Sequence, residues 1–407
     1  MNPFRDVRSI EDVEFLARRC KHVLTLFSGG VDSSYLLKVL SSSAVRVTAV
    51  AIDLGDGTNA EDLQQIAQHF GAELHVIDGR QFFIDEAVLP AIQASAQYLG
   101  IYPISSSLSR PIIAKLAVNL AYSLGCDAIL HTANQSQNSL RRLNGALRQL
   151  GYPGYVGSPY EFSAFSREEK IAALSAAGLV RFQARGISGD ANLWVREYES
   201  GCLDNPEDFE APDSIYKWTA STKNLVEGRV QITWSQGRPV SLNGRMTPPM
   251  ELIEQLNLMA GSFGIGRYSG LEHLHGGEKV LEVREAPAAA ILMSAYRHLE
   301  TATLDAELIR EKKSIEQIWV REAIEGRWFG DLRRAAASFI SETAKRVSGT
   351  VTLGLRSGAS DLVSIKAEKP LYLTDRDGWE KKIAQRRASR TLSEMEFIEP
   401  AIRAAFV

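Results

Sequence analysis

Short apolar runs alternate with amphipathic stretches in the first third of the chain. The apolar runs end in glycine or polar residues and predict buried strands, whereas apolar residues at every third or fourth position predict helices. In the last of these helices, Pro111 suits the first turn and Gly125 suits the stop. The alternation predicts an α/β fold with a doubly wound parallel sheet. The predicted strands are 23–27, 45–53, 74–77 and 127–131, and the predicted helices are 32–40, 61–70 and 111–124.

The pattern changes after about Gly186. Pairs of β-rich runs enclose turn sequences there, which is typical of hairpins. We therefore expect an α+β domain, followed by a charged amphipathic stretch that predicts a helical arm. The predicted elements are hairpins over 230–242 and 351–367, a helix over 250–259 with Thr247 as a candidate cap and Pro248 at its first position, and a long helix over 304–325.

Composition places the chain among ordinary globular proteins. It has 407 residues, of which 45% are apolar and 23% charged, which suggests two or three domains. We expect them at 1–185, 186–385 and 386–407. The net charge of -3 and the lack of a basic run argue against nucleic acid as a partner.

The same composition bounds the compartment. No uncharged apolar stretch approaches about 18 residues, so no membrane span is expected. The first residues are charged, unlike a signal peptide. The three cysteines have no close spacing, which disfavours a disulfide framework or a cysteine zinc site. We expect a cytoplasmic protein.

One loop carries clear chemistry. It lies between a predicted strand and a predicted helix, where glycines free the backbone and the helix N-terminus favours an anion. Serine hydroxyls add donors, and a carboxylate there suits Mg²⁺ on phosphates. A capped glycine turn is the plain alternative, but six specified positions in this setting favour a phosphate site. The residues concerned are Ser28, Gly29, Gly30, Asp32, Ser33 and Ser34.

The loop resembles the signature of the N-type ATP pyrophosphatases, and further motifs in the same order resemble the argininosuccinate synthase family. The resemblance runs from about Val23 to Leu371. Its motifs are Ser106-Ser107-Leu108-Ser109-Arg110-Pro111-Ile112-Ile113-Ala114-Lys115, then Ser188-Gly189-Asp190-Ala191-Asn192-Leu193, then Phe263-Gly264-Ile265-Gly266-Arg267 with Glu272.

The resemblance implies an ATP-dependent C–N ligase with a nucleotide-binding domain, a synthetase domain and a C-terminal arm exchanged in a homotetramer. In that family ATP activates the ureido oxygen of citrulline as an adenylate, and the amino group of aspartate displaces AMP. By resemblance, ATP and Mg²⁺ bind the loop, with Asp32 on the metal through Mg-ATP and Ile52 near adenine; His131 is a further candidate at a strand end. The electrophile pocket then comprises Tyr102, Ser106, Asn138, Arg142, Ser188 and Glu272, with Arg110 as an anion partner and Asp32, Arg110 and Arg142 as candidate catalytic residues.

Several positions depart from the family. Its segment His-Gly-x-Thr-Gly-Lys-Gly-Asn-Asp corresponds here to residues 131–139, so the aspartate-binding Thr becomes Asn134 and the Asp becomes Ser139. A pocket Ser becomes Glu197 and a pocket Tyr becomes Arg284. Buried charges are costly unless paired, so these two pair with each other or meet groups on a different substrate. We hypothesise that the ATP chemistry is kept and the amino-acid-like substrates are altered, as in a specialised natural-product pathway.

Other interpretations stay open at this point. One is a genuine argininosuccinate synthase that uses citrulline and aspartate. Another is a tRNA-thiolating enzyme, which needs a reactive cysteine; Cys202 is the candidate, because Cys126 lies at a strand start where packing is expected. A third is a homologue that binds nucleotide without catalysis. For His273 and His275 we expect exposed loop positions rather than a metal pair, since no third ligand is evident.

Overall fold

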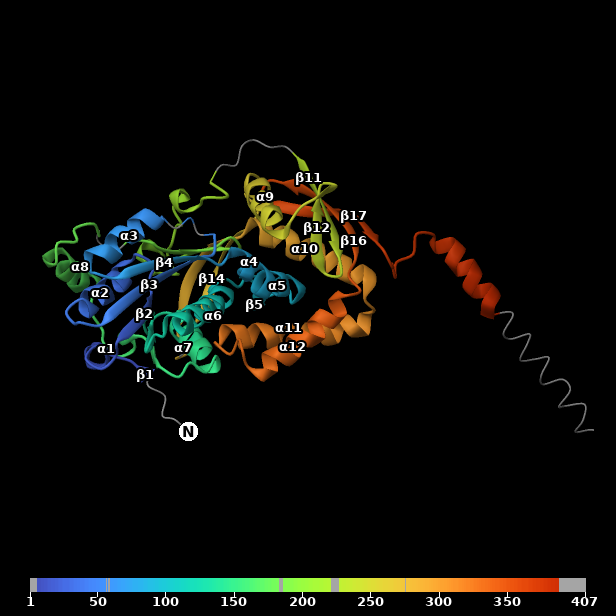
Figure 1. Ribbon diagram of the computed structural model, residues 1–407. Coiled ribbons are helices and arrows are strands. Elements are labelled where there is room, and N and C mark those ends of the chain that lie inside the picture. The colour runs from blue at the N-terminus through green and yellow to red at the C-terminus, as the bar shows by residue number, and fades with distance from the viewer. Residues whose placement is uncertain are drawn as a thin grey trace, which may run out of the picture.

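The first half of the molecule is built on a parallel β-sheet. The structure is a computed structural model that describes residues 6–55, 57, 59–182, 186–220, 227–274 and 276–387. Six strands pair in the order β1-β8-β7-β2-β3-β4, and every pair is parallel (Figure 1). The strands are β1 (Asp6–Val7), β2 (His22–Leu26), β3 (Arg46–Asp53), β4 (Glu73–Asp78), β7 (Ala128–Leu130) and β8 (Tyr155–Gly157).

Helices cover both faces of this sheet because both faces are apolar. In β2, Val23 packs in one hydrophobic core and Leu24 in the other, as the two-residue period of a strand requires. The doubly wound parallel sheet that the sequence predicts is therefore confirmed. One face carries α1 (Ile10–Ala17), α2 (Val31–Leu40), α3 (Ala60–His69) and α8 (Arg167–Ala176), and the other carries α6 (Ser106–Leu124) and α7 (Ser139–Gln149).

One predicted helix start is wrong by five residues, and the other predicted starts differ from the structure by one or two. Helix α6 begins at Ser106, so Pro111 lies inside it; burial of Leu108 and Ile112 outweighs the bias against helix before a proline. The helix expected over 304–325 is α11 (Ala306–Ile324), capped by the side chain of Asp305. Thr247 caps nothing, because Pro248 is the cap residue of α9 (Pro249–Gly261).

The second half combines two antiparallel sheets with helices. Both predicted hairpins form, as the pairs β11–β12 and β16–β17. One sheet is ordered β14-β15-β10-β9 and the other β13-β12-β11-β16-β17. The strands are β9 (Ser188–Ala191), β10 (Arg196–Glu199), β11 (Gly228–Ser235), β12 (Arg238–Leu242), β13 (Arg245–Met246), β14 (Arg267–His273), β15 (Lys279–Glu285), β16 (Gly349–Arg356) and β17 (Ala359–Ala367), and the helices besides α9 and α11 are α10 (Pro287–Thr303) and α12 (Asp331–Ala344).

The largest hydrophobic core joins the two halves. Residues from Phe83 to Ile112 pack in it together with α9 to α12, although they precede the expected boundary at 185. The domain boundaries therefore stay a prediction. The segment concerned holds α4 (Arg80–Phe83), a π-helical turn (Ile84–Val88), α5 (Leu89–Gln93), β5 (Gln97–Tyr98) and β6 (Tyr102–Pro103).

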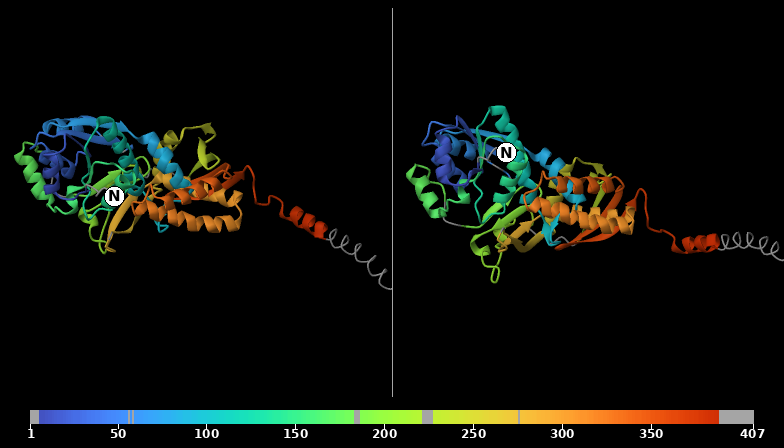
Figure 2. Two further views of the ribbon diagram at one scale, coloured as in Figure 1. Left: turned by 60° about the horizontal axis from the view of Figure 1, so that its bottom comes forward. Right: turned by 90° about the horizontal axis from the view of Figure 1, so that it is seen from below.

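A last helix over 376–387 projects away from the body of the molecule (Figures 1 and 2). The rest of the predicted arm, 388–407, lies outside the described residues. None of the helices that the structure describes is long and apolar enough to cross a membrane.

Candidate active site

A cavity of about 440 Å³ opens at the carboxyl ends of β2, β3 and β7. Its size is within the range of small-molecule sites, and its place is where ligands bind in sheets of this kind. A second hollow of about 490 Å³ adjoins it and shares Asp32, Gln137, Arg167, Ser188 and Glu199 with it. Together they provide room for a nucleotide and a second molecule.

The glycine loop forms the wall of the cavity at the start of α2. Gly29 has a φ of +72°, and an added Cβ there would lie 2.5 Å from Cδ2 of Leu63. Only glycine fits this position without strain. Gly30 is the cap residue of α2, so free N–H groups of the first helical turn face the loop. The hydroxyl of Ser33 donates to the carbonyl oxygen of Gly30 at 3.1 Å. The geometry suits an anion such as a phosphate.

Asp32 is held by Lys170 on α8 and by Tyr160, which precedes that helix. The ammonium of Lys170 donates to Oδ1 of Asp32 at 2.7 Å and lies 4.0 Å from the centre of the Tyr160 ring. The Tyr160 hydroxyl donates to the carbonyl oxygen of Asp32 at 2.8 Å. Burial, then the nearby Asp32 charge, raises the pKa of Tyr160, so this hydroxyl stays a donor. The sequence analysis missed both partners, because they follow Asp32 by more than 120 residues.

The described residues fit Mg²⁺ only together with phosphates. No group of three or more His, Cys, Asp or Glu side chains among them is placed to hold a metal ion. Asp32 supplies one carboxylate beside the loop, and magnesium is commonly bound by one or two carboxylates plus substrate phosphates. The expectation that Asp32 meets Mg²⁺ thus stays a prediction about the ATP-bound enzyme.

Arg110 links the loop side of the cavity to β9. Its Nη2 donates to Oδ2 of Asp190 at 2.5 Å, and its Nε donates to the hydroxyl of Ser139 at 2.9 Å. Burial would lower the pKa of Arg110, but the charge and hydrogen bond of Asp190 together with the charges of Glu197 and Glu199 outweigh it, and the pKa is raised. Ser139, where the family has Asp, thus receives one bond from this guanidinium.

His131 lines the cavity as a neutral ring. Its Nε2 lies 2.8 Å from Oδ1 of Asn144, and its Nδ1 accepts from the N–H of Ala133 at 3.4 Å. These partners fix the proton on Nε2. Burial lowers the pKa of His131 to about 4. The ring is therefore a supporting group rather than a general acid at neutral pH.

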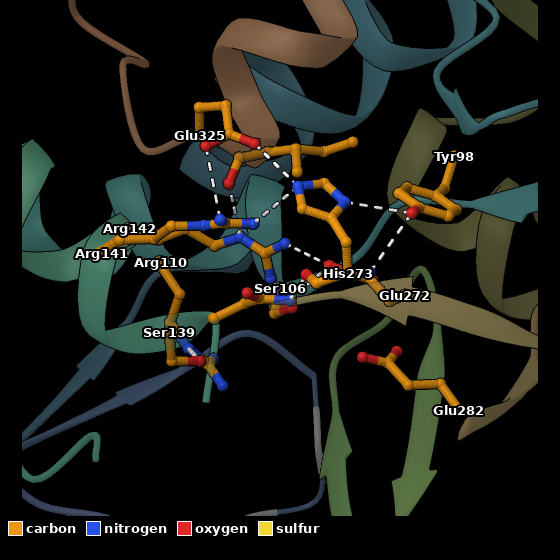
Figure 3. Close-up of polar contacts among 12 residues, drawn as sticks. Tyr98, Ser106, Arg110, Ser139, Arg141, Arg142, Glu272, His273, Glu282 and Glu325 are labelled. Carbon is orange, nitrogen blue, oxygen red and sulfur yellow. Dashed lines mark hydrogen bonds and ion pairs between the residues drawn. The ribbon is translucent and has the colours of Figure 1, made fainter. Parts of the chain in front are cut away.

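Glu272 is the centre of a buried network of charges behind the wall of the cavity. Figure 3 shows it near Arg142 and His273. Its Oε1 accepts from Nη2 of Arg142 at 2.5 Å and from Nδ2 of Asn138 at 3.0 Å. Its Oε2 accepts from Nη2 of Arg284 at 2.8 Å and from the hydroxyl of Tyr102 at 3.4 Å. Burial would raise the pKa of Glu272, but the charges of Arg142 and Arg284 lower it to about 2. Glu272 is thus a saturated carboxylate.

The two charged replacements pair with each other. Strands β10 and β15 place Glu197 directly opposite Arg284, and Nη1 of Arg284 lies 2.9 Å from Oε1 of Glu197. Arg284 also pairs with Glu282, donates to the carbonyl oxygen of Pro103 at 2.9 Å, and stacks 4.1 Å from the centre of the Tyr102 ring. Of the two alternatives for this pair, the structure shows internal pairing.

Carboxylates outnumber cations around this cavity. Burial raises the pKa of Glu282 to about 8, in spite of Arg284, with the charges of Glu272 and Glu197 adding to the rise. Burial likewise raises the pKa of Glu197 and of Glu199. The carboxyl groups of the cavity wall therefore favour binding of a proton or another cation. The charged residues that line it are Asp32, Asp190, Glu197, Glu199 and Glu282 against Arg110, Arg142 and Arg167.

Most of the sequence-predicted residues border this space. Asn134 lines only the second hollow. Ser34 is fully buried, and neither it nor Gly29, Tyr102, Glu272 or Arg284 borders the cavity; the last three form a layer behind its wall. The cavity-lining set is Ser28, Gly30, Asp32, Ser33, Ile52, Ser106, Arg110, His131, Asn138, Ser139, Arg142, Ser188 and Glu197.

His273 is not the exposed loop residue that the sequence suggested. It ends β14 half-buried, with Nδ1 3.1 Å from the Tyr98 hydroxyl and Nε2 2.9 Å from Oε1 of Glu325. Arg141 pairs with the same Glu325 at 3.3 Å. This cluster ties β14 to α7 and to the C-terminal end of α11, beside Glu272 (Figure 3). His275 lies outside the described residues.

Sequence reasoning missed further polar residues at the cavity. The position of Asp190 within a quoted motif was a usable signal for it, and the period of β10 could have paired Glu199 with Glu197 on one face. Thr132 and Gln137 lie in the segment 131–139 that was compared with the family, whereas only the folded chain brings Arg167, Glu282 and Lys170 to the site. The missed residues are Thr132, Gln137, Arg167, Asp190, Glu199 and Glu282 at the cavity and Lys170 at the second hollow.

Comparison with known proteins gives matches along nearly the whole chain. The profile of the Arginosuccinate synthase N-terminal HUP domain matches residues 21–179, and that of the Arginosuccinate synthase C-terminal domain matches 187–395. The argininosuccinate synthase of Oceanobacillus iheyensis is 36% identical, with 86% of this chain and 85% of that protein covered. The argininosuccinate synthases of Rubrobacter xylanophilus and Synechococcus elongatus are each 35% identical; the matches cover 87% and 88% of this chain, and 88% and 91% of those proteins.

Proposed function

This chain belongs to the argininosuccinate synthase family of ATP-dependent C–N ligases, and we propose that it joins an amino-acid-like electrophile to an amine that differ from citrulline and aspartate. The family's reaction releases AMP and pyrophosphate. The identity of the two substrates is the proposed part, and it is argued from the positions at which this chain departs from the family.

The observation in favour of altered substrates is the ion pair between Glu197 and Arg284. These two residues stand where the family has Ser and Tyr, and their 2.9 Å contact joins a cavity-lining carboxylate to a buried guanidinium behind it. Arg284 is 1% exposed and also occupies Oε2 of Glu272. A substrate that needs Glu272 as a ligand would have to break two buried ion pairs, which is strongly unfavourable.

The charge of the cavity wall suggests the chemistry of one partner. Glu197, Glu199 and Glu282 have raised pKa values because burial disfavours their charged forms. An ammonium group beside these carboxyl groups would favour their charged forms, and Glu282, whose pKa is raised to about 8, would then release a proton. This supports an amine that arrives as a cation, without the carboxylate of aspartate.

In the proposed reaction the loop at Ser28–Ser33 holds the pyrophosphate end of ATP. An oxygen of the electrophile attacks the α-phosphorus, and pyrophosphate leaves. The amine then attacks the activated carbon and AMP leaves with the oxygen. Arg110 and Arg142, the latter a member of the buried network, both line the cavity. In this reaction their guanidinium groups stabilise the charge on the α-phosphate.

A pyrophosphate-release assay tests the proposal. The full chain is mixed with ATP, Mg²⁺, citrulline and aspartate, and in parallel with ATP and a panel of ureido acids, carboxylic acids and amines. We expect release with a pair from the panel and little argininosuccinate from citrulline and aspartate. Robust argininosuccinate formation would overturn the altered-substrate assignment in favour of a genuine argininosuccinate synthase. Oxygen-18 in the electrophile that appears in AMP would establish the adenylate route.

Nothing observed favours the tRNA-thiolating alternative. Burial raises the pKa of the Cys126 thiol to about 11, which makes it a poor nucleophile. Cys202 is exposed but borders neither hollow. The homotetramer, the cytoplasmic location and a natural-product pathway remain predictions.

A further inference from the structure

Lys170 is a buried cation at the phosphate loop. It lies on α8, which packs against α2, and only 5% of it is exposed. Lysine is almost never buried to this degree unless it is paired. Its partner is Asp32, whose side chain is 36% exposed and borders both hollows. The pair thus joins a buried ammonium to a carboxylate that faces the space for phosphates.

The geometry holds this lysine in one place. The ammonium lies 2.7 Å from Oδ1 of Asp32 and 4.0 Å from the centre of the Tyr160 ring. Tyr160 in turn donates its hydroxyl to the main chain of Asp32 at 2.8 Å. Loop, ring and ammonium therefore form one rigid unit, in which α8 supplies the positive charge.

The positive charge of Lys170 offsets the negative charge of Asp32 beside the phosphate loop. A bare carboxylate at the loop would repel the several negative charges of a pyrophosphate group, since like charges a few ångströms apart repel strongly where water is scarce. The α2 N-terminus offers only about half of a positive charge. The Lys170 ammonium cancels the charge of Asp32 before any ligand arrives.

We propose that Lys170 is a positioning residue for the pyrophosphate group: it neutralises Asp32 and so lets the loop accept a polyanion. The inference rests on the proposed role of the loop and adds a residue from a separate helix to it. Lys170 acts through Asp32 and is not itself required to touch the ligand.

Binding of inorganic pyrophosphate to the full chain, measured by isothermal titration calorimetry in buffer with EDTA, tests the inference. We expect K170M to weaken binding by about tenfold or more, the equivalent of about 1.4 kcal/mol. K170R, which keeps the charge, retains most of the affinity. Lys38→Met, in the last turn of α2 and away from the loop, serves as the matched control. Thermal melting of each variant confirms that it is folded.

The double variant D32N/K170M decides the mechanism. Without the carboxylate there is no charge for Lys170 to cancel, so the double variant should regain nearly the affinity of the wild type. A double variant as weak as K170M, or a K170M protein that binds like the wild type, overturns the inference about Lys170. Failure of the wild type to bind pyrophosphate would instead remove the proposed role of the loop itself.

Discussion

Two buried networks of charged side chains invite comparison. The site network consists of Glu197, Glu272, Glu282, Arg142 and Arg284, and three of its members line the cavity. The helical network consists of Arg297 and Glu300 on α10 and Lys312 and Glu316 on α11, none of which borders either hollow.

The networks differ in charge balance. Two cations face two carboxylates in the helical network, so each charge has a partner and the cluster can only hold helices together. Three carboxylates face two guanidinium groups in the site network. The excess is reflected in Glu282, whose pKa burial raises to about 8, with the charges of Glu272 and Glu197 adding to the rise. Burial also raises the pKa of Glu300, but the charges of Lys312 and Arg297 oppose that rise. We infer that the balanced helical network serves stability, and that the unbalanced network beside the cavity serves ligand binding.

The largest effect is expected from breaking the balanced network. Lys312→Met removes the cation that lies 2.8 Å from Oε1 of Glu300 and also pairs with Glu316. Breaking a buried pair by removing one partner costs about 3–5 kcal/mol. Urea unfolding of K312M should show this loss, with Lys313→Met on the exposed side of α11 as the control. Loss of less than about 1 kcal/mol, the range of exposed pairs, would refute the structural role.

The next prediction concerns turnover, measured on variant protein that thermal melting shows to be folded, because Glu272 also belongs to two buried ion pairs. Glu272→Gln removes the negative charge that orients Arg142 and Arg284. We expect pyrophosphate release, with the substrate pair found in the screen, to fall about 100-fold, the scale of losing one preorganised electrostatic group. Glu278→Gln, exposed in the turn that follows β14, is the control. Equal rates for the two variants would contradict the assignment of the site network to function.

A pH series tests the excess carboxylate. Because the pKa of Glu282 is raised from 4.5 to about 8 on folding, the folded state keeps a proton that the unfolded state has lost. The free energy of unfolding should therefore fall as pH rises from about 5 to about 8, by at most about 1.4 kcal/mol per pH unit from this group. In Glu282→Gln that part of the slope should vanish. Parallel wild-type and variant curves would show that Glu282 is ionised throughout.

The smallest effect is expected outside both networks. Cys202 is exposed, and its replacement by Ser should change the free energy of unfolding by no more than about 0.5 kcal/mol. Pyrophosphate release should also be unchanged. Complete loss of activity in Cys202→Ser would revive the thiolation alternative.

The sequence predicts what depends on neighbours along the chain. The loop between β2 and α2 can be predicted because the strand, the glycines and the helix start follow one another directly between His22 and Val31. The start of α6 was not, because tertiary burial of Leu108 and Ile112 decides it. The register that sets Glu197 against Arg284 was likewise out of reach, and internal pairing could only be named as one of two options. The sequence around Lys170 does not indicate a role at the site, because its partner Asp32 lies 138 residues away.

Arg142 belongs to the first half of the chain, yet its Nε donates to the carbonyl oxygen of Ile324 at 3.1 Å and its Nη2 binds Glu272. Anyone who recombines this protein with a relative therefore cannot treat its halves as exchangeable parts. A hybrid would take Arg142 from one parent and its partners in the second half from the other. The contacts would form only where the two sides match. On the proposed function, substrate choice depends on contacts between the two halves, so residues on both sides of these contacts should be transferred together.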